Sequence, residues 1–230
     1  MGIIIPTLDE ERALPPTLAS LESLNFDEII VVDGGSRDQT QTLVESYQVS
    51  VPSHAIRVIE SLPGRARQMN AGASESRADI VVFLHADTRL PVDARAVIER
   101  VASDSQFVGG RFDVQFEQDR GYAWVISRMM NFRSRWSGIS TGDQALFVRR
   151  TVFQQLGGFE DIPIMEDIEF TSRLKRVGKI AALRSKVITS FRRWEQRGPF
   201  RTIINMWTLR FLYWMGVRPD ILHQYYGNIR

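Results

Sequence analysis

The chain has 230 residues, of which 43% are hydrophobic and 24% are charged, and its formal net charge is +2 at pH 7. These values are typical of a globular protein in which one large domain buries a sizeable core. Because the chain contains no cysteine, disulfides, thiolate catalysis and zinc-thiolate sites are excluded.

Apolar strands alternate with helical patterns in the first part of the chain. We expect strands at residues 3–5, 28–33, 55–59 and 80–87. Helices are expected between them, at residues 14–21, 43–47 and 65–76, where apolar side chains recur at helical spacing. This alternation predicts an α/β fold with a mainly parallel sheet and helices on both of its faces.

Beyond residue 90 the pattern is looser. Helices are expected over residues 91–101, 122–130, 152–156 and 166–177, and strands over residues 108–116 and 145–148. No internal repeat, low-complexity run or linker interrupts the sequence. We therefore treat residues 1–195 as one domain and residues 196–230 as a helical extension that contacts an acceptor, a membrane surface or a second subunit.

The strand at residues 80–87 ends in His85-Ala86-Asp87. Strand geometry predicts that His85 and Asp87 lie on the same side, with Ala86 pointing away. Ligands of open α/β sheets bind outside the carboxyl ends of strands, and a carboxylate there suits a divalent metal with bound phosphate. Both side chains are candidate ligands, although a hydrogen-bonded structural role for His85 is equally compatible with the sequence.

Two other segments place acids where a ligand could bind. Asp33 ends the strand at residues 28–33, before the turn Gly34-Gly35-Ser36. The glycines permit close approach of a ligand, and Asp33 can accept a hydrogen bond from a base or a ribose; a tight turn explains the same residues. Glu166 and Asp167 fall in the first turn of a predicted helix, where the helix dipole favours acids whatever their function.

The last third of the chain is basic and aromatic. Residues 173–220 contain twelve Lys or Arg but two acids, which suits a phosphorylated substrate, an anionic membrane surface or nucleic acid. Residues 200–216 are apolar around much of the predicted helix, with Arg201 and Arg210 as the only charges. Such a helix lies in a bilayer interface, covers the sheet or forms a dimer contact, and the sequence leaves these alternatives open.

Five motifs, taken in order, resemble those of family 2 glycosyltransferases of the GT-A fold. They are Pro6-Thr7-Leu8-Asp9-Glu10, Val32-Asp33-Gly34-Gly35-Ser36-Arg37-Asp38-Gln39-Thr40, Asn70-Ala71-Gly72, His85-Ala86-Asp87 and Glu166-Asp167. The resemblance covers residues 1–195 and is greatest to a bacterial subgroup named for arsenosugar biosynthesis. It implies a Rossmann-like, mixed but mainly parallel sheet flanked by helices, and a nucleotide-sugar donor.

The resemblance also assigns the donor side residue by residue. Nucleotide binding falls to Pro6, Thr7, Glu10, Asp33, Gly34, Gly35, Arg67, Asn70, His85 and Ala86. Asp33 resembles the acid that contacts uracil, which makes a UDP-sugar the expected donor. Asp87 matches the last acid of the Asp-x-Asp motif and would bind the Mn²⁺ or Mg²⁺ that bridges the diphosphate. His85 stands where the family commonly has Asp, and imidazole suits manganese better than magnesium.

For the reaction, the resemblance implies inversion, with Asp167 as the general base that deprotonates an acceptor hydroxyl and Glu166 beside it. The acceptor and diphosphate side is predicted to comprise Gly142, Asp143, Gln144, Arg192, Arg193 and Trp194. The last three resemble part of the Gln-x-x-Arg-Trp motif of processive synthases, but position 190 is Ser, so processive polymerisation is not expected.

We therefore expect a metal-dependent, inverting glycosyltransferase of the hexosyltransferase type, with a hydroxyl acceptor that is soluble or lipid-linked. The alternative is a non-catalytic nucleotide-sugar-binding protein; a nucleic-acid or membrane adaptor would leave the ordered motifs unexplained. No stretch approaches the roughly twenty apolar residues of a membrane span, and residues 3–5 are too short for a signal peptide. The expected location is the cytoplasm, with peripheral attachment to the inner membrane face and a homodimer as open alternatives.

Overall fold

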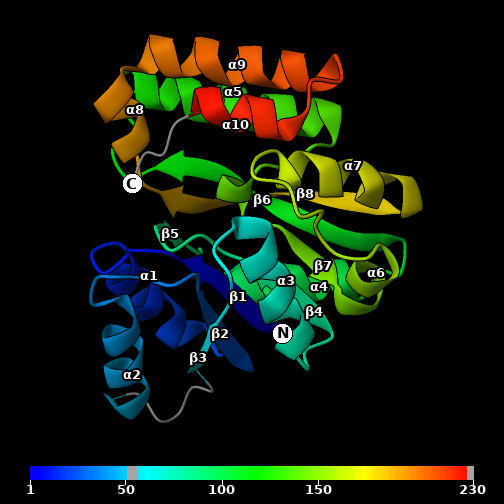
Figure 1. Ribbon diagram of the computed structural model, residues 1–230. Helices are drawn as coiled ribbons and strands as arrows, with labels where there is room; N and C mark the ends of the chain where they lie inside the picture. The colour runs from blue at the N-terminus through cyan, green and yellow to red at the C-terminus, as the bar shows by residue number, and fades with distance from the viewer. Residues whose placement is uncertain (51–55, 227–230) are drawn as a thin grey trace.

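The structure, a computed structural model, describes residues 1–50 and 56–226, so Ala55 at the start of the third expected strand lies outside it. A mixed sheet forms its centre, with the strand order β3-β2-β1-β4-β7-β6-β8-β5 (Figure 1). The strands are β1 (Gly2–Thr7), β2 (Glu28–Asp33), β3 (Ile56–Glu60), β4 (Ile80–Phe83), β5 (Thr88–Arg89), β6 (Phe107–Phe116), β7 (Phe147–Arg149) and β8 (Lys179–Thr189).

Helices connect the strands and cover the sheet (Figure 1). They are α1 (Leu14–Leu21), α2 (Thr40–Ser50), α3 (Arg65–Glu75), α4 (Ala94–Ala102), α5 (Tyr122–Ser137), α6 (Arg150–Gln155), α7 (Glu166–Val177), α8 (Arg192–Arg197), α9 (Pro199–Trp214) and α10 (Pro219–Tyr226). Two short 3-10 turns, η1 (Glu22–Leu24) and η2 (Gly142–Gln144), complete the described elements.

The first four strands in space run parallel because a helix returns the chain to the same edge of the sheet after each of them. β1 pairs in parallel with β2 and β4, and β2 pairs in parallel with β3. β7 is antiparallel to both β4 and β6, whereas β8 is parallel to β6 and antiparallel to β5. The predicted α/β fold, with a mixed and mainly parallel sheet flanked by helices, is confirmed.

Side chains from the two faces of the sheet form separate cores. Along β1, Ile3 and Ile5 enter the core on one face, while Ile4 enters the core on the other, as strand alternation requires. On the second face, α3 packs so closely on β1 that a Cβ atom at Gly72 would lie 2.5 Å from the Ile4 side chain. The close packing of α3 fixes where its first turn meets the carboxyl ends of β1 and β4.

Three segments differ from the sequence predictions. β8 was not predicted, because its burial alternates irregularly and it carries charged side chains such as Lys179 and Lys186. α5 continues to Ser137 rather than ending near residue 130. The prediction of a strand through residue 87 is wrong, since β4 ends at Phe83 and a turn follows before β5.

The helices α5, α9 and α10 form a layer beyond the β6–β8 end of the sheet (Figure 1). α5 contacts the start of α9 through the rings of Tyr122 and Phe200, whose centroids are 5.6 Å apart. α9 and α10 contact the segment before α7 through a small apolar cluster that contains Met165, Leu209 and Leu222. None of the described helices is long and apolar enough to cross a bilayer.

Candidate active site

A cavity of about 350 Å³ opens beyond the carboxyl ends of β1 and β4. The first turns of α3 and α7, the turn η2, the end of β8 and the helices α9 and α10 complete its wall. The residues predicted from the sequence that line it are Pro6, Thr7, Glu10, His85, Ala86, Asp87, Gly142, Asp143, Glu166, Asp167, Arg192 and Trp194. Residues far apart in the chain therefore meet at the sheet edge that the sequence indicates.

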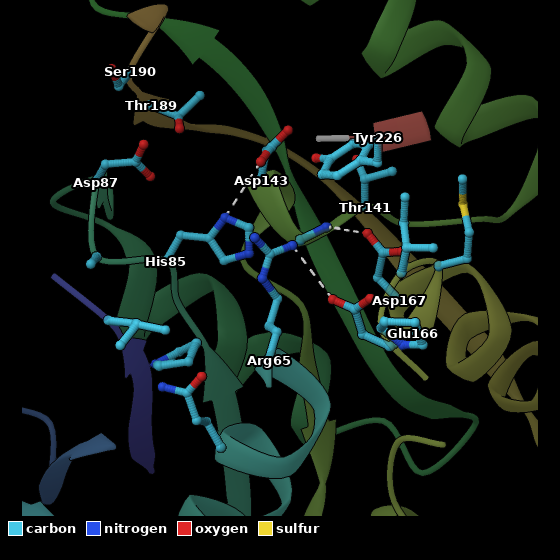
Figure 2. A pocket seen from close by; sticks show the side chains of 18 of the residues that line it. Arg65, His85, Asp87, Thr141, Asp143, Glu166, Asp167, Thr189, Ser190 and Tyr226 are labelled. Atoms are coloured by element: carbon cyan, nitrogen blue, oxygen red, sulfur yellow. Dashed lines mark hydrogen bonds and ion pairs between the residues drawn. The ribbon is translucent and has the colours of Figure 1, made fainter. Parts of the chain in front are cut away.

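Asp87 lies at one end of the cavity, beside Thr189 and Ser190 (Figure 2). A second acid, Glu10, forms an ion pair with Arg192 at 3.7 Å. Burial and, next, the nearby Asp87 carboxylate raise the pKa of Glu10 above its usual value, against the effect of Arg192. Two carboxylates whose charges repel each other are favourable surroundings for a divalent cation.

His85 is directed away from Asp87, towards the turn η2 (Figure 2). Its Nδ1 atom lies 3.4 Å from an Asp143 carboxylate oxygen, and its Nε2 atom is buried without a hydrogen-bond partner. A Cβ atom at Gly142 would lie 2.3 Å from that Nε2 atom, so the imidazole fits only because position 142 is glycine. These contacts favour the structural interpretation of His85 over the role of metal ligand.

Asp167 and Glu166 lie at the opposite end of the cavity from Asp87 (Figure 2). They begin α7 as predicted, after Met165 turns the chain with a positive φ of 73°. One Asp167 carboxylate oxygen accepts a hydrogen bond from the Gly142 amide and the other from the Ile168 amide, both at 2.7 Å. Each oxygen keeps a further lone pair, so Asp167 is a fixed carboxylate that can still accept a proton.

Glu166 differs from its neighbour because it is only 3% exposed. Burial raises its pKa, against the lowering effect of Arg65, whose guanidinium lies 3.4 Å from the Glu166 carboxylate. The Arg65 side chain itself keeps 43% of its surface exposed, because it lines the cavity between His85 and the two acids (Figure 2). The two adjacent acids therefore differ in their surroundings: Glu166 is buried against Arg65, and both oxygens of Asp167 are held by backbone amides at the wall of the cavity.

Sequence analysis missed several residues that line the cavity. They are Arg65, Gln68, Thr189, Ser190, Met206, Arg210, His223 and Tyr226. Arg65 and Gln68 share the first turn of α3 at a spacing of three residues, a signal that places both on one helix face. Thr189 carried no comparable signal because β8 was not predicted, and α10 lies in the helical extension predicted over residues 196–230, where the sequence marked no lining residue.

Other predicted residues lie outside the lining of the cavity. Asp33 is fully buried and accepts hydrogen bonds from the Gly35 amide (3.0 Å), the Ser36 amide (2.8 Å) and the Gln41 side chain (2.9 Å). These contacts fix the turn that contains Gly34. A contact of Asp33 with a base stays a prediction.

The remaining predicted residues have structural partners. Arg67 forms an ion pair with Asp161 at 2.8 Å, and the Asn70 side chain both donates to and accepts from the backbone of Phe159. Gln144 is fully buried and closes η2 by a capping box with Thr141. The side chain of Arg193 falls outside the described part of the structure. Ligand contacts of these residues stay predictions.

The arrangement unites the parts of a group-transfer site. Asp87 and Glu10 carry the hard oxygen atoms that divalent metals prefer, Arg65 and Arg192 carry positive charge that can attract an anionic group, and the Asp167 carboxylate can accept a proton. Mg²⁺ and Mn²⁺ in phosphate sites are commonly held by one or two carboxylates plus phosphate oxygens. The donor set therefore fits a metal–diphosphate unit, although the described residues contain no cluster of three or more acids, histidines or cysteines that would hold a metal alone.

The sheet order and the placement of the cavity define the GT-A fold of glycosyltransferases. Among solved structures of this fold, the mannosyltransferase PcManGT of Pyrobaculum calidifontis in complex with GDP-Man and Mn²⁺ aligns with a TM-score of 0.68 over 91% of this chain and 59% of that chain, at 20% identity. The chain belongs to the family "Glycosyl transferase family 2", which it matches over residues 2–157.

Two curated proteins are similar to this chain over much of its length. The probable glycosyltransferase YdaM of Bacillus subtilis is 25% identical over 219 residues, which are 85% of this chain and 50% of the relative. The undecaprenyl-phosphate 4-deoxy-4-formamido-L-arabinose transferase of Pseudomonas aeruginosa is 29% identical over 158 residues, 65% of this chain and 46% of the relative. The chain thus spans about half of the length of these relatives.

Proposed function

We propose that the protein transfers a sugar from a nucleotide-sugar donor, with UDP as the nucleotide, to an acceptor hydroxyl. The configuration of the anomeric carbon is inverted in this transfer. The observation that carries this proposal is the fixed Asp167 carboxylate, which shares one cavity with Asp87 and the basic side chains Arg65 and Arg192. Family membership supports the class of reaction. The choice of UDP rests on the likeness of Asp33 to a uracil-contacting acid.

In this reaction the diphosphate occupies the end of the cavity near Asp87. Asp87, with Glu10 beside it, would hold a divalent metal, and the metal would supply charge stabilisation to the departing diphosphate. Arg192 is near enough to Glu10 to contact the same group. At the other end, Asp167 removes the proton of the acceptor hydroxyl as that oxygen attacks the anomeric carbon. No covalent enzyme intermediate is required.

A nucleotide-sugar screen tests the proposed function. We expect UDP-sugars with Mn²⁺ to raise the unfolding temperature more than GDP- or TDP-sugars, because a ligand at about 100 times its Kd stabilises by about 2.7 kcal/mol. The nucleotide sugar that stabilises the protein should also be turned over. Release of UDP should be measurable when the sugar is transferred to an acceptor or to water. Stabilisation without any turnover would support the alternative, a non-catalytic binding protein. If no nucleotide sugar stabilises the chain, the proposal fails.

We further propose that the acceptor is carried by a membrane lipid. The name of the Pseudomonas relative includes undecaprenyl phosphate, and the helical layer of this chain exposes many aromatic side chains. On α5 and α9 these are Tyr122, Trp124, Phe132, Trp136, Phe200, Trp207, Phe211 and Trp214. So many exposed aromatic side chains on two neighbouring helices favour an interaction surface, and Trp and Tyr suit the headgroup region of a bilayer.

Vesicle flotation tests the membrane surface. We expect the protein to float with phosphatidylcholine–phosphatidylglycerol vesicles, and the variants Trp136→Ser and Trp214→Ser each to weaken binding by tenfold or more. Both side chains are largely exposed, at 84% and 78%, and burying one such side chain contributes about 1.5–3 kcal/mol. Point variants are preferable to deletion of residues 198–230, because Arg210, His223 and Tyr226 line the cavity.

The matched control for flotation is Val92→Ser. Val92 is an apolar side chain that is 90% exposed and does not belong to the helices α5, α9 and α10. This variant should float like the wild type. Absence of flotation by the wild type would overturn the membrane proposal. Sedimentation of the wild type as a dimer that the Trp variants dissociate would assign the face to a homodimer instead.

The domain boundary near residue 195 and the arsenosugar-type subgroup remain predictions. The boundary is supported by the change from sheet to helices after β8. The subgroup rests on the segment Ser190-Phe191-Arg192-Arg193-Trp194-Glu195, in which Trp194 packs on Phe116 and lines the cavity. Peripheral attachment to the inner membrane face is the location that fits the proposed acceptor.

A further inference from the structure

In the part of the chain that the structure describes, buried side-chain nitrogens without hydrogen-bond partners occur on three arginines, of which Arg210 lines the cavity and Arg133 lies close enough to Arg210 to interact with it electrostatically. Within residues 1–50 and 56–226, the buried side-chain nitrogens and oxygens that lack a partner belong to His85, Arg111, Arg133 and Arg210. The arginines come from β6, α5 and α9 respectively. A buried guanidinium N–H without an acceptor costs free energy, and several such groups in one region indicate an anionic ligand.

Arg133 belongs to α5 and Arg210 to α9, which are neighbouring helices of the layer (Figure 1). Arg133 has both Nε and Nη2 free, the edge of the guanidinium whose two N–H bonds run parallel. Arg210 has its Nε free and lines the cavity together with Asp167. The two arginines are close enough to interact electrostatically with each other and with Asp143 and Asp167.

Among the described residues, neither Arg133 nor Arg210 has an ion pair within 4.0 Å, and Asp143 and Asp167 act on both electrostatically from farther away. Asp113 is shared by Arg111 at 3.2 Å and Arg135 at 2.8 Å. Burial and, next, repulsion from Arg210 lower the pKa of Arg133 to about 10. Burial likewise lowers the pKa of Arg210. Because a pKa of about 10 lies well above neutral pH, Arg133 stays a cation.

We propose that Arg133 and Arg210 bind a phosphate monoester carried by the acceptor. Two parallel donors on Arg133 and a third donor on Arg210 can bind the oxygens of one phosphate group, and the charge of a phosphate monoester, about −1.5 to −2 at neutral pH, matches two guanidinium cations better than the single charge of a carboxylate does. Glu10, Asp87 and Arg192 lie towards the other end of the cavity, where the donor diphosphate is proposed to bind. The term acceptor rests on the proposed transferase function; the phosphate site itself does not.

Inorganic phosphate is the probe for this site. We expect titration calorimetry to show that phosphate binds the wild type, and that Arg133→Gln and Arg210→Gln each lower its affinity by on the order of tenfold or more, since a charged hydrogen bond contributes about 1.5–3 kcal/mol. The matched control is Arg128→Gln, an exposed cation on the same helix as Arg133, which should leave phosphate affinity unchanged. Equal affinity in the wild type and both Gln variants would overturn the proposal.

Binding of UDP separates this site from the donor site. Neither Gln variant should lose affinity for UDP with Mn²⁺; if UDP affinity falls as much as phosphate affinity, the arginines belong to the donor site and the proposal is wrong. If UDP does not bind the wild type but the phosphate results hold, the proposed function fails and the phosphate site stands. A ligand-free measurement adds a further check, because removal of an unpaired buried cation should not lower the unfolding temperature. A marked fall in Arg133→Gln would indicate a structural arginine instead.

A vesicle arm distinguishes the two sources of a phosphate monoester. Phosphatidylcholine vesicles that contain phosphatidic acid present a phosphate monoester on a lipid. Vesicles that contain phosphatidylglycerol serve as the comparison, because their anionic headgroup is a phosphate diester. Stronger flotation with phosphatidic acid, competed by inorganic phosphate and lost in Arg210→Gln, would assign the site to a lipid headgroup. Phosphate binding without this preference would assign it to a phosphorylated acceptor in solution.

Discussion

Replacement of Asp167 by Asn is expected to lower the rate of sugar transfer by about 10²- to 10⁴-fold, the usual contribution of a general base. The substitution keeps the size of the side chain but removes its ability to take up a proton. Both Asp167 oxygens accept backbone N–H bonds, from Gly142 and Ile168, so an Asn amide must lose one of them. A small loss of stability, about 1 kcal/mol, should accompany the loss of activity.

Donor binding separates the two effects of the Asp167→Asn variant. Calorimetry with UDP and Mn²⁺ should give wild-type affinity, because the variant leaves the Asp87 end of the cavity intact. Glu169→Gln is the matched control: it removes an acid from the same helical turn, where Glu169 pairs with Arg173, and it should retain transfer. Equal losses of UDP affinity and of transfer would show that Asp167 contributes to binding rather than to proton removal.

Asp87→Ala is expected to reduce the affinity for UDP in the presence of Mn²⁺ by at least tenfold, about 1.4 kcal/mol, and to abolish the difference between Mn²⁺ and EDTA. The physical reason is loss of a carboxylate that would hold the metal on the diphosphate. The remaining Glu10 carboxylate should not hold the metal on its own, because it is a single ligand and shares its charge with Arg192. Titration calorimetry with and without metal measures both quantities.

The control for the metal experiment is Asp104→Ala, which removes an acid that does not line the cavity. This variant should bind UDP and Mn²⁺ like the wild type. A wild-type protein that binds UDP equally well in Mn²⁺ and in EDTA would contradict the metal role of Asp87. The same measurement on His85→Ala tests the role of His85. A smaller difference between Mn²⁺ and EDTA would indicate a metal contact, whereas an unchanged difference would leave His85 with its structural contacts to Asp143 and Gly142.

The regular half of the fold was predictable because its strands are buried on both faces. β1, β2 and β4 are continuous apolar runs, and the helices between them repeat at helical spacing, so local patterns sufficed. β8 escaped prediction because its partner β6 lies far away in the sequence, and its half-exposed surface leaves no period of two. Tertiary pairing rather than local propensity makes it a strand.

The candidate site likewise contains residues that could be predicted from the sequence and residues that could not. Acids at strand ends and at helix starts, such as Asp87 and Asp167, are marked by their position in the sequence. Arg133 and Arg210 carry no local mark, since arginine is common on exposed helix faces, and the only mark on Arg65 is its spacing of three residues from Gln68. The burial of nitrogens of Arg133 and Arg210 without hydrogen-bond partners emerges only when the helices of the layer pack together.

The peptide unit at Gly142 joins the two ends of the site. Its amide holds Asp167, and its missing side chain makes room for His85, which follows the strand that leads to Asp87. In the proposed reaction, a shift of this turn on acceptor binding would reach both the imidazole and the carboxylate. By thermodynamic linkage, any effect of the acceptor on the affinity for the donor would then be returned by the donor in equal measure.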